Sequence, residues 1–133
     1  MLLTDIEIGW IAGFVDGEGC FGISKHHCYV EVVNTKEDPI RFLYERFGGS
    51  LRFALRPDNS RQKPCWRWCV SGKEALIFTK VISEHLKVKK PQSELLLKYT
   101  VSISGKKLSK DIRDSRESIK SQMALLNKRG LLV

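Results

Sequence analysis

Residues 9–19 of this chain read GWIAGFVDGEG, and the expected arrangement of the other elements follows from this stretch. When residues 5–17 are wound as a helix at about 100° per residue, the side chains divide into two stripes. The small stripe consists of Asp5, Gly9, Ala12, Gly13, Asp16 and Gly17, and the bulky stripe consists of Ile8, Trp10, Ile11, Phe14 and Val15. Because a glycine inside a helix costs roughly 1 kcal/mol relative to alanine, glycines at four-residue spacing need a packing or functional reason. We therefore expect the small stripe to lie against another backbone.

The segment is expected to be a helix of a soluble domain. In membranes the same glycine spacing marks helix pairs in contact, but two acidic residues and a short apolar run exclude a membrane-spanning segment here. The bulky stripe is then expected to pack on its own domain. The small stripe, which includes Gly9, Ala12, Gly13 and Asp16, is expected to meet a second helix.

Length, composition and charge fit a small protein that binds nucleic acid. A chain of 133 residues, 42% of them apolar, can form one domain with a modest core. Residues 1–24 contain four acids and no Lys or Arg, so all 23 basic residues lie in 25–133. A basic body with an acidic spot suits a bound polyanion and a cation at the acids, although a solvated basic surface would have the same charge. No signal peptide, transit peptide or membrane span is visible, so we expect a soluble protein without a membrane partner.

The four cysteines, at positions 20, 28, 65 and 69, were considered as a metal site. Their spacings do not match those of a zinc finger or a zinc ribbon. We therefore expect thiols in a reducing compartment.

The remaining patterns predict an α+β domain. Thr4 and Glu7 form a capping-box pattern that starts the first helix. The predicted strands are 20–25, 28–33, 51–55 and 66–70, and further helices start near residues 37, 72 and 91. The order helix, hairpin, helix, hairpin, helix, helix gives one four-stranded antiparallel sheet with helices covering one face. Residues 1–104 are predicted to form the core domain, and residues 105–133 a C-terminal helical extension of the same domain.

Strand alternation indicates which side chains lie on the uncovered face of the sheet. These are Ser24, His26, Tyr29, Glu31, Arg52, Arg56 and Arg67. A twisted sheet can lie in the major groove of DNA, where arginine reads guanine and mixed polar side chains read other bases. Any antiparallel sheet can wet one face with polar residues, but the three arginines favour a DNA-binding face.

Residues 11–19, IAGFVDGEG, resemble the motif of the LAGLIDADG homing endonucleases position by position, with conservative exchanges. Residues 47–50 and 86–92 resemble segments that the family has in the same places, so the resemblance covers most of residues 5–104. Only one copy of the motif is present, and single-motif chains of this family act as homodimers. The resemblance therefore implies a dimer contact formed by Gly9, Ala12, Gly13 and Asp16. The resemblance implies that the uncovered sheet face is a DNA saddle.

The acidic end of the motif carries the predicted metal site. Phosphodiester hydrolysis needs a metal to organise water and take up charge, and Mg²⁺ prefers carboxylate and carbonyl oxygens. Glu18 occupies the position of the motif's last acid, the family's metal carboxylate, and the Gly17 carbonyl is a second oxygen donor. Asp16 lies on the small stripe, so we expect it to cap or bridge the two helices instead of binding metal.

Two further residues are assigned to catalysis through the resemblance. Lys89 aligns with the family's active-site lysine, although its neighbours Lys87 and Lys90 leave the register open by one. Asn34 corresponds to a polar residue that helps to place water, with Thr35 as the alternative.

The expected function is a homodimeric, site-specific endonuclease that cuts double-stranded DNA at a long, near-palindromic target and promotes intron or intein mobility. Mg²⁺ is the expected cofactor, with Mn²⁺ as an alternative. Ca²⁺ is expected to support binding with little cleavage, and no small-molecule substrate is expected. The alternative function is a binder that does not cut, either an RNA-splicing maturase or a repressor on the same scaffold.

Overall fold

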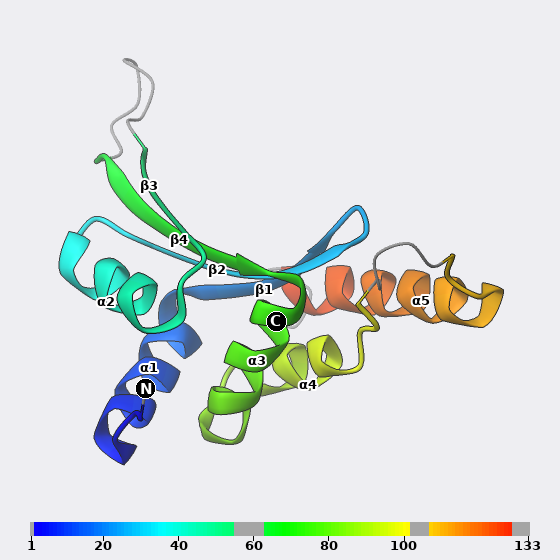
Figure 1. Ribbon diagram of the computed structural model, residues 1–133, viewed down its shortest axis with the longest axis horizontal. Helices are drawn as coiled ribbons and strands as arrows, with labels where there is room; N and C mark the ends of the chain where they lie inside the picture. Colours follow the sequence, from blue (N-terminus) through cyan, green and yellow to red (C-terminus); the bar gives the residue numbers. More distant parts are fainter. Residues whose placement is uncertain (1, 55–62, 102–106, 129–133) are drawn as a thin grey trace.

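A computed structural model describes residues 2–54, 63–101 and 107–128, which form one antiparallel sheet and a set of helices (Figure 1). The elements are α1 Asp5–Glu18, β1 Gly19–Ser24, β2 His27–Asn34, α2 Glu37–Phe47, β3 Ser50–Ala54, β4 Cys65–Ser71, α3 Gly72–Ile82, the 3₁₀ helix η1 Ser83–His85, α4 Lys90–Leu97 and α5 Lys110–Asn127. This order confirms the predicted α+β fold. Arg56, one of the predicted DNA contacts, lies outside the described residues.

The sheet has the strand order β1-β2-β4-β3, and every neighbouring pair is antiparallel. In its central row, Val30 of β2 pairs with Phe21 of β1 and Val70 of β4. These side chains are 0–2% exposed, because the helices cover this face. The two ends of the sheet rise away from helices α1 to α4, so the opposite face is concave (Figure 1).

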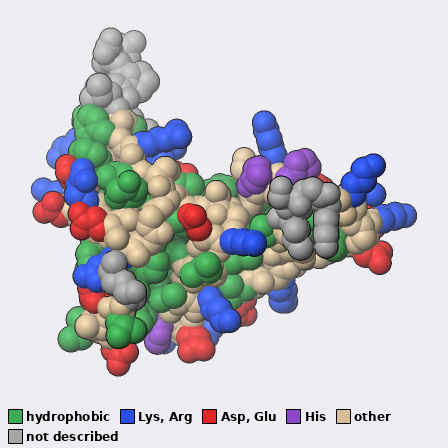
Figure 2. Space-filling view, in the orientation of Figure 1, with side chains coloured by type: hydrophobic (Ala, Val, Ile, Leu, Met, Phe, Trp, Pro, Cys, Tyr) green, Lys and Arg blue, Asp and Glu red, His purple; other side chains and the backbone are tan. Residues whose placement is uncertain are grey.

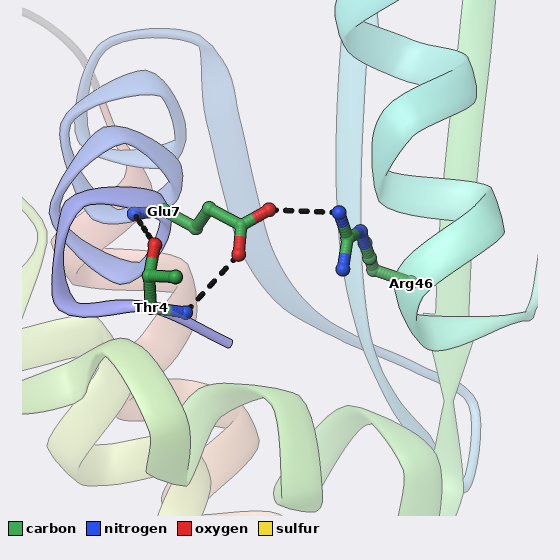
Figure 3. A network of polar contacts seen from close by, with 3 residues as sticks. All are labelled: Thr4, Glu7 and Arg46. Atoms are coloured by element: carbon green, nitrogen blue, oxygen red, sulfur yellow. Dashed lines mark hydrogen bonds and ion pairs between the residues drawn. The ribbon is translucent and has the colours of Figure 1, made fainter. Parts of the chain in front are cut away.

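The first helix starts at the predicted capping box and is tied there to α2. The Thr4 N–H donates to Glu7 Oε1, and the Glu7 N–H donates to Thr4 Oγ1, both at 3.1 Å. The second oxygen of Glu7 lies 2.8 Å from Arg46 Nη2, as Figure 3 shows. A single carboxylate therefore caps α1 and joins it to α2.

The buried face of α1 differs from the predicted division by residue size. Ile11 and Val15 are fully buried, as expected, but Ala12 is also in the core, with 1% of its surface exposed. Because Ala12 follows Ile11 and precedes Val15 by three residues, its methyl group falls on the same buried face. Its predicted place in a dimer contact is therefore wrong. Trp10 is 45% exposed; it stacks on Phe14 and meets the edge of Phe42 on α2.

The C-terminal region forms one long helix that packs on β1 and α4. Ile119 and Met123 of α5 are buried, and Asn127 Nδ2 donates to the Phe21 carbonyl at 2.8 Å. Arg116 Nε donates to the Thr100 carbonyl at 2.7 Å. Within the described ranges, no helix combines the length and apolar character that a membrane crossing requires.

Candidate nucleic-acid interface and catalytic centre

The end of α1 and the segment before α4 meet at Asp16. The Asp16 carboxylate accepts hydrogen bonds from the N–H groups of Lys87, Val88 and Lys89 at 2.8–3.0 Å. Lys89 Nζ donates to the Asp16 carbonyl at 2.6 Å. The ammonium group is thus held at the C-terminal end of α1, where the helix dipole favours a positive charge. Glu18 lies two residues further along the chain.

The electrostatics of this junction keep Asp16 ionised. Desolvation raises the pKa of Asp16 and is the largest single effect, but it is outweighed. Hydrogen bonds from the backbone N–H groups of Lys89, Val88 and Lys87, together with the Lys89 charge, leave the pKa of Asp16 below its ordinary value. Because both oxygens of Asp16 serve its own chain, its predicted bridge to a second helix is replaced by a contact with residues 87–89.

Glu18 and Gly17 lie at the turn from α1 into the sheet. Glu18 is the last residue of α1 and is exposed, and Gly19 begins β1, where it pairs with Val32. In the part of the chain that the structure describes, no three His, Cys, Asp or Glu side chains gather in a group that could hold a metal ion. The Glu18 carboxylate and Gly17 carbonyl suit Mg²⁺, which binds through one or two carboxylates, water and substrate phosphates. One chain alone would supply only part of such a coordination shell.

Asn34 is the last residue of β2, two positions beyond the Val32–Gly19 pair. Its Oδ1 accepts the Lys36 N–H at 2.8 Å, which closes a turn toward α2. The side chain is half-buried, whereas that of Thr35 is exposed. Strand pairing therefore brings Asn34 toward the end of α1. Its carboxamide oxygen, however, accepts the hydrogen bond from Lys36 within the turn.

The concave face of the sheet carries most of the predicted DNA contacts. Strand pairing places Glu31 of β2 between Cys20 and Cys69, and Arg67 of β4 opposite Arg52 of β3. Arg67 Nε lies 3.2 Å from Glu31 Oε1. Burial and the Glu31 charge raise the pKa of the Cys69 thiol, while the charges of Arg52 and Arg67 oppose this shift. Two guanidinium groups and one carboxylate thus share this end of the face.

The turn between β1 and β2 consists of Lys25 and His26, so His26 lies in the connection, as the predicted strand bounds imply. Because β2 starts at His27 and that residue pairs with Ser24, His27 shares the concave face with Tyr29. The hollow at this end of the sheet has a volume of about 540 Å³ and is lined by Ser24, Lys25, His27, Tyr29, Glu31, Cys69 and Ser71. Figure 2 shows histidine side chains gathered at the tip of this hairpin beside a basic side chain. Lys25 and His27 line this hollow and are candidate contacts outside the predicted set. His27 was missed because the predicted strand began at residue 28, one residue after β2 begins.

The outward face of α1 is lined by glycine and large apolar side chains. A Cβ added to Gly9, Gly13 or Gly17 would meet no atom within 4 Å in the described part of the chain. Packing within one chain therefore does not require these glycines. Ile6 is 85% exposed on the same helix, and the half-exposed Trp10 lies between α1 and α2. An open groove of about 570 Å³ runs there, lined by Ile6, Glu7, Trp10, Asp38, Pro39 and Phe42.

All four cysteines are thiols and none forms a disulfide. Cys28 is fully buried, and burial raises the pKa of its thiol.

No protein-family model matches the chain. The probable intron-encoded endonuclease aI2 of Debaryomyces hansenii is 39% identical over 46 residues. This match covers 32% of the chain and 7% of the relative, so the chain spans a small part of that protein's length.

Solved structures match over nearly the whole chain. The homing endonuclease I-CvuI, crystallised with its target in the presence of Ca, has a TM-score of 0.65 at 17% identity, covering 96% of this chain and 87% of that one. A second I-CvuI structure, with Mg and uncleaved DNA, has a TM-score of 0.59 at 20% identity, with coverages of 91% and 77%. The archaeal intron-encoded homing endonuclease I-Vdi141I, complexed with DNA, has a TM-score of 0.72 at 15% identity, with coverages of 95% and 87%.

The levels of identity to these structures are low enough that the match establishes the fold and not the activity. The fold has the element order and the four-stranded sheet that the helix and strand patterns of the sequence predict. The chain therefore has the fold of the LAGLIDADG homing endonucleases.

Proposed function

We propose that the chain is a homodimeric, metal-dependent endonuclease that cuts double-stranded DNA at a specific site. The observation that carries the proposal is the hydrogen bond from Lys89 Nζ to the Asp16 carbonyl. It brings an ammonium group to the end of the helix that bears Glu18, where α1 enters a sheet whose concave face carries Arg52 and Arg67. A carboxylate, a lysine and a basic face at one place suit phosphodiester hydrolysis.

The concave face would bind the duplex. Its guanidinium groups suit guanine edges and phosphates, and Glu31 suits the amino group of cytosine. The solved structures of I-CvuI and I-Vdi141I, which share the fold, are complexes with DNA. With the duplex on the concave face of the sheet, the end of α1 would lie beside the phosphate backbone of the DNA.

A second copy of the chain would cover the glycine face of α1. Gly9, Gly13 and Gly17 allow another helix to approach, and a Cβ at any of the three would meet no atom of the described residues within 4 Å. An isologous contact through α1 would bring the Glu18 residues of two chains together at the two-fold axis. The two carboxylates would then be placed to act on opposite strands.

Each residue has a separate task in this proposal. Glu18 and the Gly17 carbonyl would hold a divalent ion, which when bound supplies positive charge and an activated water. Lys89 would donate a hydrogen bond to a phosphate oxygen and stabilise the charge that develops on it. Asn34 would orient water through its Nδ2 group, because Oδ1 is used by Lys36.

The test begins with selection of bound duplexes from a randomised DNA library, followed by cleavage of the selected sequence in a plasmid with and without Mg²⁺. Glu18→Gln keeps the size of the side chain and removes the charge that a hard cation needs, so cleavage is expected to be lost while DNA affinity is kept. Glu45→Gln, the same change at an exposed position of α2, is the matched control. Full cleavage by Glu18→Gln would refute the metal assignment. A wild type that binds DNA but does not cut it, whichever divalent metal is added, would favour the function of a maturase or a repressor.

A further inference from the structure

Asp16 lies between the two halves of the candidate catalytic centre, yet neither the metal assignment nor the DNA contacts use its carboxylate. We propose that Asp16 is the positioning residue of Lys89, holding residues 87–89 and the lysine ammonium against the C-terminal end of α1. This inference rests on the proposed function, because it takes Lys89 as the residue that acts on the phosphate.

Three consecutive N–H groups point to one carboxylate. Lys87 donates to Oδ2 at 2.8 Å, Lys89 donates to Oδ1 at 2.8 Å, and Val88 lies within 3.0 Å of both oxygens. The Asp16 carbonyl also accepts a hydrogen bond from Lys89 Nζ. Both the side chain and the backbone of Asp16 therefore bind the segment 87–89. These contacts join residues that are 71–73 positions apart in the chain.

The segment that Asp16 holds has no regular structure of its own. It lies between η1, which ends at His85, and α4, which begins at Lys90. Lys89 precedes α4 as its N-cap residue and makes no side-chain capping bond. Leu86 is buried, but Val88 is 71% exposed, so apolar packing anchors the start of the segment and not its middle. The Asp16 carboxylate supplies the contacts that the middle lacks.

The position of a lysine matters because its side chain is long and flexible. A lysine ammonium sits on a four-carbon stem with several rotatable bonds. Fixing the Lys89 backbone through its N–H group and its ammonium through the Asp16 carbonyl restricts both ends of this stem. Small displacements of a catalytic group can cost roughly 100-fold in rate, so loss of the carboxylate should slow the chemical step more than DNA binding.

The experiment compares Asp16→Ala, Asp16→Asn, Lys89→Ala and the double variant Asp16→Ala/Lys89→Ala. Thr4→Ala is the matched control, because it removes a side-chain cap at the other end of α1 without touching Lys89. Amide hydrogen exchange by NMR reports on residues 87–89. Single-turnover cleavage of the selected duplex and its dissociation constant are measured on the same proteins.

In Asp16→Ala, the amides of Val88 and Lys89 are expected to exchange at least about tenfold faster, and to stay unchanged in Thr4→Ala. The cleavage rate is expected to fall roughly 10- to 100-fold, with the dissociation constant within about twofold. The double variant is expected to cleave no more slowly than Lys89→Ala alone, because Asp16 acts through Lys89. If Asp16→Ala does not fold, Asp16→Asn, which has the same shape, carries the comparison.

If the amides of Val88 and Lys89 exchange at wild-type rates in the Asp16 variants, the inference is overturned. It is also overturned if the fold-losses in cleavage rate of Asp16→Ala and Lys89→Ala multiply in the double variant. A merely structural role for Asp16 would give such multiplication, with reduced stability and no coupling to Lys89. A wild type that does not cut DNA would instead overturn the proposed function and the catalytic part of the inference. In that case the exchange rates alone would still decide whether Asp16 holds residues 87–89.

Discussion

Arg67 and Arg52 face each other across the β3–β4 ladder, and like charges directly opposite in a sheet are unfavourable. Glu31 compensates part of this charge through its ion pair with Arg67, which uses Nε. The Nη groups of Arg67 are the donors that guanine O6 and N7 would accept from. Arg52 and Arg67 are therefore better explained as part of an anion-binding surface than as residues that stabilise the fold.

Arg67→Ala and Arg52→Ala are each expected to relax base preference at particular positions, at a cost of about 1–3 kcal/mol in binding free energy. Lys63→Ala, in the basic loop region before β4, is expected to weaken binding to all sequences and to lower the salt dependence. Selection from randomised duplexes, repeated at two salt concentrations, measures both effects. Unchanged base preferences in both arginine variants would mean that another face of the sheet meets DNA.

Cys28 and Cys20 provide a second residue-level prediction. Cys28 is fully buried and burial raises the pKa of its thiol, whereas Cys20 is exposed. Since the thiolate is the reactive form, a raised pKa means less thiolate at a given pH. A thiol-alkylating reagent is expected to modify Cys20 first and Cys28 only after unfolding, at pH 7 and at pH 9. Mass spectrometry of the labelled peptides measures this order, and early labelling of Cys28 in the native protein would contradict it.

At the scale of the element, the N-terminus of α1 depends on one capping box. Thr4→Ala removes the acceptor of the Glu7 N–H and is expected to lower the free energy of unfolding by about 1 kcal/mol. Thr4→Ser keeps the hydroxyl group and is expected to stay close to the wild type. Urea denaturation measures the difference, and equal stability of Thr4→Ala and Thr4→Ser would show that the capping bond contributes little.

The elements themselves could be predicted from the sequence because their signals are local. Val30 and Val32 alternate with Tyr29 and Glu31, and this period of two fixes both the strand and its buried face. The face of α1 was harder, because residue size does not determine burial. Ala12 is small but lies in the core, and the position of Trp10 depends on Phe42 of another helix.

Candidate site residues could be proposed from the sequence because their segments resemble those of a known family. Glu18 lies in the motif at residues 11–19, and Lys89 lies in the segment 86–92. The contact of Asp16 with residues 87–89 joins distant parts of the chain, and no local pattern in either segment indicates it. The sequence pattern predicted the connection at residues 26 and 27, whereas the turn lies at residues 25 and 26 and His27 begins β2. Contacts across the fold and the register of a turn therefore needed the structure.

At the scale of the whole molecule, the glycines of α1 distinguish folding from assembly. A Cβ atom at Gly13 would meet nothing within 4 Å among the described residues, so Gly13→Leu is expected to leave the monomer folded. In the proposed dimer the same position lies where two backbones approach, and overpacking there costs roughly 1–3 kcal/mol or more. Glu45→Leu introduces the same side chain at an exposed site on α2 and is expected to leave assembly unchanged. Analytical ultracentrifugation at micromolar concentration should find a dimer for the wild type and Glu45→Leu and a weakened dimer for Gly13→Leu, with circular dichroism confirming that all three are folded. A monomeric wild type would refute the proposed dimer, and a Gly13→Leu dimer of undiminished strength would place the second copy elsewhere than on α1. With either result, the pairing of two Glu18 carboxylates would have to be abandoned.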